Sequence, residues 1–387
     1  MKIKVCHVVS TLDIGGIERW LLNVAGYLRT TYPAEVQFDF LTLFGGGGRL
    51  SADFENLGCN HHSVNFSWQN IGSTIRQLNA VFCKEQYDVV HCHVDYLSGI
   101  VLPVAKRAGI PLKINHIHNT HFAFDETSKP IRWLAGRVLK RLCLHATDLQ
   151  IGCSKASLEA FVGRSFCCTP QIVHFCSTQL KAFREVNNLN INKVKEGFSF
   201  SSDSHVIIHV GRHTEAKNLV FMLDALQHLV NLDPKIVLLF AGSGPLTAYL
   251  KSVVLDKKLA DHVYFLGDRN DIPVLLRTAD VLVLPSLYEG LPVAVVEAQA
   301  AGVRCLIADH ITSEVEIVPN LISRISLSAG AKEWANILQS ELNKPAFDKA
   351  GALSFVEASP FNLENGCELL LDLYRESLKK IPTLTRP

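Results

Sequence analysis

Short apolar segments alternate with helical patterns along almost the whole chain, and this alternation limits the fold more than any other feature. Between the segments lie helical patterns such as Ile17–Leu28, in which Trp20 and Val24 fall on one face. Nearly continuous apolar strands have to be covered on both faces, so the pattern predicts an α/β fold with doubly wound parallel sheets. The strands predicted in the first half are Ile3–Val9, Val36–Leu43, His62–Asn65, Asp88–His93, Leu112–Ile117, Leu149–Gly152 and Gln171–Phe175.

The alternation restarts after a polar segment rich in Asn, Lys and Ser, about Thr178 to Ser204, which we interpret as a linker. Beyond it, helical patterns include Asn218–Asn231 and Val293–Ala301. The strands predicted in this half are His205–Val210, Lys235–Ala241, Val263–Gly267, Val281–Pro285 and Arg304–Ile307.

The chain's 387 residues are too many for one ordinary core. We therefore predict two Rossmann-like domains, residues 1–184 and 185–360, with a cleft between them. A helix at about 363–380, after a second irregular region, is expected to pack back onto the first domain. Ligands of such sheets bind beyond the carboxyl ends of the strands.

Composition excludes some classes of protein. Lys and Arg number 38 against 37 Asp and Glu, a balance that argues against a nucleic-acid binder. The 11 cysteines show no repeated zinc-site spacing, and their odd number fits a reducing compartment. We find neither a secretory signal nor an apolar stretch long enough to span a membrane, so we expect a cytoplasmic protein.

Two glycines, Gly15 and Gly16, stand between the strand Ile3–Val9 and the helix that follows. Glycines at such a turn allow close backbone approach to a ligand and direct the helix N-terminal amides at an anion. The run is neither a GxGxxG fingerprint nor a P-loop, which disfavours a nicotinamide cofactor and an ATPase. A simple tight turn is the alternative.

Directly after the strand His205–Val210 comes the run Gly211-Arg212-His213-Thr214-Glu215-Ala216-Lys217-Asn218. Its two cations, Arg212 and Lys217, are placed where a parallel sheet binds ligands, and charge-assisted contacts suit a diphosphate. A solvated basic loop is the alternative interpretation.

The third motif is PSLYEGLPVAVVEAQAAG, in which Glu289 follows an apolar strand and Glu297 lies within an apolar helix. A carboxylate in such surroundings needs hydrogen-bond donors, and sugar or ribose hydroxyls are suitable ones. Gly290 and Leu291 follow Glu289, and the glycine permits close backbone approach. Pairing of Glu297 with a neighbouring cation is the alternative that we weigh against a site.

These motifs resemble those of the retaining glycosyltransferases of family four. The spacing Glu289-x7-Glu297 is similar to that family's signature, and GRHTEAKNL resembles its phosphate-binding loop. HVVSTLDIGGIERWLLNVA, DVVHCHVDYLSG and INHIHNTH resemble its first-domain segments. The resemblance extends over nearly the whole chain and implies the GT-B fold, with a nucleotide sugar bound between two Rossmann-like domains.

The resemblance also implies roles for the donor-side residues. Arg212 and Lys217 would neutralise the departing diphosphate, and Gly211 belongs to their loop. Glu289 would contact the donor sugar, and Glu297 would bind the ribose hydroxyls.

For the remaining site residues, the resemblance implies that Gly15 and Gly16 frame the phosphates and the acceptor side. His118 would hydrogen-bond a hydroxyl of the donor sugar, and the backbone around Arg269 and Asn270 would receive the base.

One segment departs from the family pattern. Where the family has an Asn-Gly-hydrophobic-Asp run, this chain has Cys176-Ser177-Thr178-Gln179. The departure puts the geometry of the hinge in question but leaves the donor site intact.

The sequence thus predicts a metal-independent, retaining transferase without a cofactor. The donor would be a nucleotide sugar, and the acceptor a glycan or lipid-linked glycan. No Asp-x-Asp pair marks a metal-bound donor, and cations with helix N-termini would stabilise the diphosphate instead. We keep a nucleotide-sugar epimerase or hydrolase, and a catalytically silent nucleotide-sugar binder, as alternatives.

A third alternative is a metal-dependent hydrolase, because His91, His93 and Asp95 alternate as zinc ligands do in some hydrolases. We favour hydrogen-bonded histidines, since no further ligands of such a site can be identified downstream.

The helix predicted at 129–145 carries cations beside apolar residues and has two interpretations. It could touch an anionic membrane peripherally, at the inner face, or it could be a solvated face packed on the sheet, which we prefer. The apolar residues concerned are Ile131, Trp133, Leu134, Val138, Leu139 and Leu142.

Overall fold

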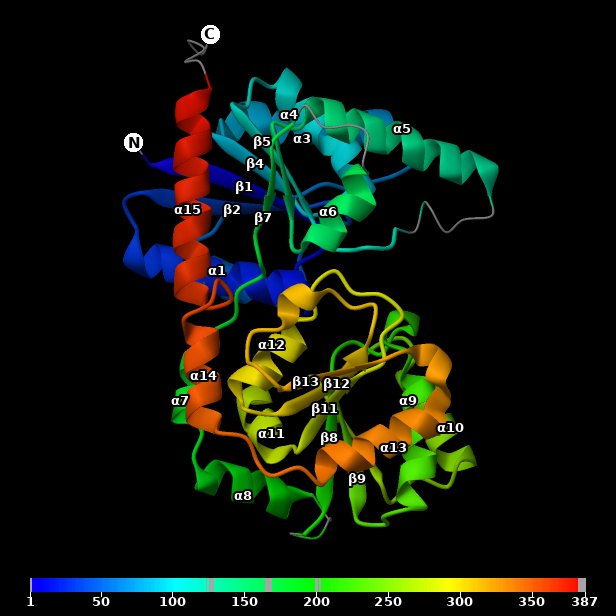
Figure 1. Ribbon diagram of the computed structural model, residues 1–387. Helices are drawn as coiled ribbons and strands as arrows, with labels where there is room; N and C mark the ends of the chain where they lie inside the picture. Colours follow the sequence, from blue (N-terminus) through cyan, green and yellow to red (C-terminus); the bar gives the residue numbers. More distant parts are fainter. Residues whose placement is uncertain are drawn as a thin grey trace. The chain divides into compact units, whose positions relative to one another are not determined.

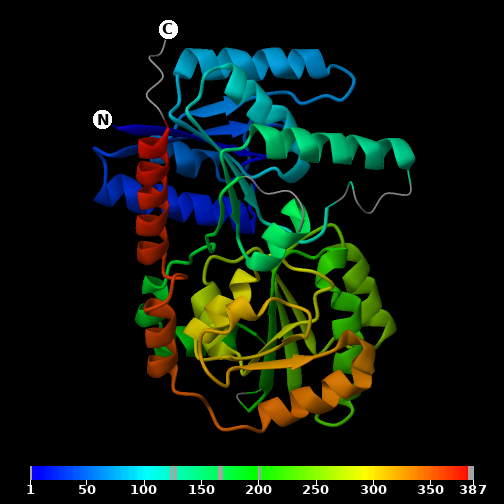
Figure 2. The ribbon, with the colours of Figure 1, turned by 45° about the horizontal axis from the view of Figure 1, so that its top comes forward.

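The computed structural model describes residues 2–122, 124, 129–163, 169–198, 201 and 203–381. The chain divides into two compact units, which we treat separately. Unit 1 combines the residues up to Ser177 with the C-terminal helix, and unit 2 runs from Thr178 to Asn362. Each unit is a parallel sheet between helices (Figures 1 and 2), so the α/β fold with parallel sheets predicted from the alternation is confirmed.

Unit 1 contains a sheet of 7 strands in the order β3-β2-β1-β4-β5-β6-β7. All of its strand pairs are parallel. The strands are β1 (Ile3–Val9), β2 (Val36–Thr42), β3 (His61–Ser63), β4 (Val89–Cys92), β5 (Leu112–Ile117), β6 (Leu149–Gly152) and β7 (Gln171–Val173).

The helices of unit 1 cover this sheet with amphipathic faces. In the first helix the buried residues include Trp20, Val24 and Leu28, the face predicted from the sequence. The last helix contacts the first, so a segment from the end of the chain completes unit 1. The helices are α1 (Gly16–Thr31), α2 (Ser51–Asn56), α3 (Ile71–Glu85), the 3-10 turn η1 (Asp95–Leu97), α4 (Ser98–Arg107), α5 (Pro130–Ala146), α6 (Lys155–Val162) and α15 (Leu363–Lys380).

Unit 2 contains a parallel sheet of 6 strands in the order β10-β9-β8-β11-β12-β13. Its central strands are buried along their whole length because both faces are covered by helices. The strands are β8 (His205–Val210), β9 (Ile236–Ala241), β10 (Val263–Gly267), β11 (Val281–Leu284), β12 (Arg304–Ala308) and β13 (Ile322–Ile325).

The connections of unit 2 contain most of its helices. They are α7 (Lys181–Glu185), α8 (Asn188–Gly197), η2 (Glu215–Lys217), α9 (Leu219–Val230), α10 (Thr247–Asp256), α11 (Ile272–Thr278), α12 (Val293–Ala300), η3 (Ser313–Val315), η4 (Leu327–Ala329), α13 (Gly330–Leu342) and α14 (Lys349–Glu357).

Two segments expected to be irregular are helical. The linker interpretation of Thr178 to Ser204 is wrong for its described part, because α7 and α8 occupy it and both pack against α11. The sequence-based domain limit at residue 184 falls inside α7. The second irregular region contains β13, α13 and α14, where Trp334 is fully buried. Residues 199, 200 and 202 lie outside the described residues.

Candidate active site

The strand order of unit 2 reverses between β8 and β11. These two strands are parallel neighbours, while β9 continues the sheet on one side and β12 on the other. The loops that leave their carboxyl ends therefore diverge, and such a switch point is where open α/β sheets bind ligands. The motifs around Arg212 and Glu289 follow these two strands, so the topology brings them to one place.

The loop after β8 has a backbone suited to close approach. Gly211 has φ +156°, a conformation that side-chain-bearing residues rarely adopt, and a Cβ there would lie 3.3 Å from His209 Nε2. Asn218 has φ +52° and directs the chain into α9. The amide of Leu287 donates to Ala216 O at 2.8 Å and ties this loop to the loop after β11.

Lys217 and Glu289 form an ion pair, with 2.6 Å between Nζ and Oε1. The side chains are only 20% and 10% exposed, so the pair is far better shielded than an ordinary surface salt bridge. Arg212, another sequence-predicted residue, is exposed in the same loop as Lys217. Its neighbour His213 is buried, and His213 Nδ1 lies at hydrogen-bond distance, 2.9 Å, from Thr247 Oγ1. The solvated-loop interpretation therefore does not describe Lys217.

Glu297 lies on α12, where its side chain is half-buried. Its Oε1 accepts a hydrogen bond from Thr178 Oγ1 at 3.0 Å. Thr178 belongs to the segment that departs from the family pattern, so the departure reaches one of the predicted site residues. Gly290 is buried and Leu291 half-buried in the turn that leads into the helix.

Arg269 and Asn270 follow β10, two strands from the switch point. The Arg269 guanidinium makes a paired contact with Asp271, at 2.8 and 2.6 Å, which lowers the pKa of that carboxyl. Asn270 is exposed. The side chain of Arg269 is thus occupied within its own turn, which is compatible with a role for the backbone alone.

Two residues at this edge were missed by the sequence reasoning. His209 Nε2 and Ser286 Oγ are buried and make no hydrogen bond within the described part of the chain. Burial, followed by the charge of Lys217, lowers the pKa of His209 to about 3, so its ring is neutral. A polar residue at the end of an apolar strand was the signal that marked both positions.

In unit 1 the strand order reverses between β1 and β4. Gly15 is the residue before α1, with an extended backbone and no side chain to cap the helix. The carboxylate of Glu18, in the first turn of α1, lies beside this N-terminus. A Cβ on Gly15 would lie 2.2 Å from Glu18 Oε2, whereas Gly16 has open space.

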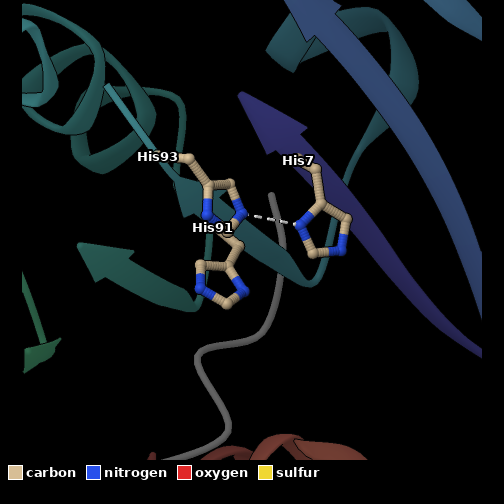
Figure 3. Close-up of side chains that lie close together, drawn as sticks. All are labelled: His7, His91 and His93. Carbon is tan, nitrogen blue, oxygen red and sulfur yellow. Dashed lines mark hydrogen bonds between the residues drawn. The ribbon is translucent and has the colours of Figure 1, made fainter. Parts of the chain in front are cut away.

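Six buried histidines gather at this edge and form the histidine cluster: His7, His91, His93, His116, His118 and His174. Figure 3 shows three of them, with the bond from His7 Nδ1 to His93 Nε2 at 3.0 Å. One chain of bonds continues from His93 Nδ1 to His118 Nε2 at 2.9 Å. A second chain runs from Tyr374 Oη to His91 at 2.8 Å and on to His116 at 3.2 Å.

Burial dominates the electrostatics of the cluster. Removal from water lowers the pKa of His7 and of His118 to about 3 and that of His93 well below its ordinary value. All three rings are therefore neutral at pH 7, and each one carries a single N–H.

His118, the predicted sugar ligand, follows β5 and is 8% exposed. Its Nε2 is bonded to His93, and its Nδ1 lies 3.6 Å from Cys176 Sγ, a long contact with a weakly polar atom. Cys176 is the first residue of the departing segment, which thus contacts a predicted site residue here as well.

The alternation of His91, His93 and Asp95 does not continue along one strand, because β4 ends at Cys92. Asp95 lies in η1 with φ +47°, and its Oδ2 accepts from Asn119 at 2.9 Å. His91 and His93 stack at 4.4 Å with 28° between the ring planes, and several cluster nitrogens lie near enough for one ion. Stacked rings direct their lone pairs side by side, so a shared ion would require the rings to turn.

Comparison with known proteins agrees with this arrangement. Residues 190–350 match the family described as Glycosyl transferases group 1, and residues 14–168 match Glycosyltransferase Family 4. EpsF of Bacillus subtilis is 32% identical over 339 residues, which cover 87% of this chain and 86% of EpsF. An Escherichia coli UDP-Gal:alpha-D-GlcNAc-diphosphoundecaprenol alpha-1,3-galactosyltransferase is 31% identical, with 80% of each chain covered.

Solved structures share the fold. Anabaena Alr3699/HepE in complex with UDP-glucose superimposes with a TM-score of 0.80 at 18% identity, covering 97% of this chain and 100% of that chain. The family match does not favour the hydrolase and epimerase alternatives. This chain belongs to the group 1 and family 4 glycosyltransferases, enzymes of GT-B type that act on nucleotide sugars.

Proposed function

We propose that this glycosyltransferase moves a hexose from a nucleoside-diphosphate donor to a hydroxyl of a glycan or lipid-linked glycan, with retention and without a metal. The observation that carries the proposal is the shielded Lys217–Glu289 pair at the switch point of unit 2. A lysine held there can stabilise the negative charge that develops on a departing diphosphate. Arg212, exposed in the same loop, adds a second cation.

The donor is best assigned to a uridine nucleotide. The Escherichia coli relative is named for a UDP-galactose donor, and Alr3699/HepE binds UDP-glucose. Glu297 would accept hydrogen bonds from the ribose hydroxyls, joining or replacing Thr178 at its carboxylate. His209 and Ser286 offer two further buried polar atoms near the phosphates.

The proposed reaction needs no covalent enzyme intermediate. The acceptor oxygen bonds to the anomeric carbon on the face that the diphosphate leaves, and the bond from that carbon to the phosphate oxygen breaks. The acceptor proton passes to the same phosphate oxygen, and a nucleoside diphosphate departs. Lys217 and Arg212 would stabilise the leaving charge in place of a divalent ion.

The same relative is named for a diphosphoundecaprenol-linked acceptor, so a lipid-linked acceptor at a membrane is the natural extension. The basic helix predicted at 129–145 is the segment proposed to meet that membrane. None of the described helices is long and apolar enough to cross a bilayer itself. The described cysteines are all free thiols, which supports the proposed cytoplasmic location.

A panel of nucleotide sugars tests the donor. A ligand that binds the native state raises the apparent melting temperature by mass action. We expect UDP-hexoses to raise it more than GDP- or ADP-sugars, and we expect the same rise in EDTA. Transfer to a lipid-diphosphate glycan, followed by NMR of the anomeric proton, should show the donor's configuration retained. An inverted product, or a rise only with added metal, would contradict the proposal.

A further inference from the structure

Unit 2 contains a pocket that is separate from the loops around Lys217 and Glu289. Its volume is about 420 Å³, which is in the range of small-molecule sites. The lining comes from α7, α8, α11 and α14 and from Val186, which joins the first two of these helices. Figure 1 shows the four helices on one side of unit 2, and α11 contacts both α7 and α8.

Apolar side chains form most of the lining of this pocket. They are Phe183, Val186, Ile191, Ala350 and Leu353. Phe183 and Leu353 are buried in unit 2, so the core holds this part of the lining in place. A lining of this kind suits the apolar body of a ligand, while a small number of polar groups fix its orientation.

The other lining residues are cations, and Arg277 of α11 is the most shielded of them. It is half-buried, whereas Arg184 and Lys349 are exposed. The guanidinium makes one hydrogen bond within the described part of the chain, from Nη2 to Phe183 O at 3.3 Å, and its Nε is buried without a partner there. Burial lowers the pKa of Arg277, and no acidic group among the described residues offsets that effect.

A second arginine of unit 2 shows how such a charge is ordinarily compensated. The side chain of Arg324 is 22% exposed, and it pairs with Glu316 and donates to the backbone oxygens of Ile311 and Thr312. Arg277 has given up water without gaining either kind of compensation in full. A charge in this position is costly until an opposite charge meets it. An anion in the pocket would supply that opposite charge.

The rim of the pocket adds positive charge beside Arg277. Lys349 Nζ donates to the backbone oxygen of Arg277 at 3.4 Å, so the two cations are neighbours. The nearby carboxylates are engaged elsewhere: Glu357 pairs with Arg184 at 2.5 Å, and Asp348 accepts from an amide of α14. The pocket therefore combines an apolar lining with a net positive rim.

We propose that this pocket, which we call the Arg277 pocket, binds a small amphiphilic anion, an apolar body that carries one phosphate or carboxylate group. The anionic group would lie against Arg277 and Lys349, because a guanidinium and an ammonium make charge-assisted hydrogen bonds to such oxygens. The body would lie on Phe183, Ile191 and Leu353. Charge and apolar lining are both used, so neither half of the ligand should bind well alone.

Calorimetric titration of the full-length protein tests the site with four probes. Hexyl phosphate and hexanoate carry both an anionic group and an apolar chain, whereas inorganic phosphate and hexanol carry one feature each. We expect hexyl phosphate or hexanoate to bind at least about tenfold more tightly than either partial probe, the effect of one charge-assisted contact or of a few buried methylenes. The tighter of the two full probes identifies the anionic group.

Variants locate the bound probe. Arg277→Gln should weaken binding of the full probe at least about tenfold, and Lys349→Gln about two- to fivefold, since that lysine is exposed. Ala350→Phe should also weaken it about tenfold, because Ala350 is an exposed residue of the lining and a phenyl group there occupies part of the pocket. Lys332→Gln, an exposed lysine of α13, is the matched control and should bind as the wild type does.

Lys217→Ala separates this pocket from the donor loops and keeps the test independent of the proposed function. Its affinity for hexyl phosphate should equal that of the wild type, whether or not the protein transfers sugar. Thermal melting without a ligand completes the test, and Arg277→Gln should melt no lower than the wild type, because it removes a charge that has no counter-ion.

Four results would overturn the proposal. The first is no binding of hexyl phosphate or hexanoate by the wild type, and the second is binding of inorganic phosphate as tight as that of the full probes. The third is wild-type affinity in Arg277→Gln together with a lower melting temperature, which would make Arg277 a structural residue. The fourth is a loss of affinity in Lys217→Ala as large as in Arg277→Gln, which would place the probe at the donor loops.

Discussion

Units 1 and 2 both contain a parallel sheet whose strand order reverses at a switch point, but the side chains at the two switch points differ in charge. Unit 2 has a shielded ion pair between β8 and β11, Lys217 with Glu289. Unit 1 has neutral rings between β1 and β4, where His7 and His93 bond at 3.0 Å. A fixed charge suits a diphosphate, whereas neutral donors and acceptors suit hydroxyls. We therefore propose that the two units divide the transfer reaction, with the diphosphate assigned to the charged site of unit 2 and hydroxyl groups to the neutral histidines of unit 1.

The largest effect should follow from removing the charge in unit 2. Lys217→Ala is expected to lower turnover roughly 10²–10³-fold, because the developing diphosphate charge loses its main cation. Lys217→Arg should rescue only partly, since a guanidinium has a different geometry. Turnover at saturating donor is the measurement, with Lys332→Ala as an exposed-lysine control and thermal melting as a check of folding. Near-normal turnover of Lys217→Ala would contradict the assignment of the diphosphate charge to Lys217 in unit 2.

The next largest effect should be a loss of stability of unit 1 in acid. The pKa of His7 and of His118 is lowered to about 3 by burial, so protonation favours the unfolded chain. Their contribution to stability is complete above pH 6.5 and is lost as the pH falls toward 3. At pH 5, which is 1.5 units below the ordinary histidine pKa of 6.5, each ring should lower the free energy of unfolding by ~2 kcal/mol, at about 1.4 kcal/mol per pH unit. Urea unfolding at pH 7 and pH 5 measures this loss.

The control for the acid effect is a change of the histidines themselves. His7→Phe should reduce the difference between the two pH values, whereas His228→Gln, at an exposed position of α9, should leave it as in the wild type. An equal loss in all three proteins would show that the cluster does not cause the acid sensitivity.

Thr178 offers a smaller test of the charged half. Thr178→Val removes the hydrogen bond to Glu297 Oε1 and should weaken UDP binding about two- to tenfold, the effect of a bond worth ~0.5–1.5 kcal/mol. Thr178→Ser keeps the hydroxyl and should bind as the wild type does. Calorimetric titration with UDP distinguishes the two. Tighter binding by the valine variant would mean that Thr178 competes with the nucleotide.

Arg269 should have the smallest effect. Its pair with Asp271 is partly exposed, with side chains 37% and 36% accessible. Arg269→Ala should therefore change the free energy of unfolding by ~1 kcal/mol or less and leave UDP binding within about twofold. A larger loss of UDP affinity would show that the Arg269 side chain, and not only its backbone, meets the nucleotide.

The sequence predicted the fold well because buried parallel strands leave a direct pattern of apolar residues. It failed where the signal depends on packing. The segment Thr178 to Ser204 looked like a linker because α8 is short and polar, and only its contact with α11 makes it part of unit 2. For the helix predicted at 129–145 two interpretations stayed open, since a sequence cannot show which side of an amphipathic helix meets the protein. In α5 that side contains Gly136, Leu139, Cys143 and Ala146.

The sequence predicted only those site residues that a strand pattern or a family motif marks. Lys217 and Glu289 lie in the loops that follow the neighbouring strands β8 and β11, so the strand order predicts that they come close together. Two hydrogen bonds had no local sequence signal because they join residues far apart in the chain. They are the bond between Thr178 and Glu297 and the bond between Tyr374 and His91. His209 and Ser286 had a signal, a polar residue closing an apolar strand, that was weaker than the family motifs beside it.

The division of chemistry between the units is tested most directly by UDP affinity in two variants. We expect Lys217→Ala to raise the dissociation constant for UDP at least about tenfold, the effect of losing one charge-assisted contact. His118→Ala should leave it within about twofold, although transfer should fall. Tight UDP binding by Lys217→Ala together with weak binding by His118→Ala would contradict the assignment of the diphosphate to unit 2.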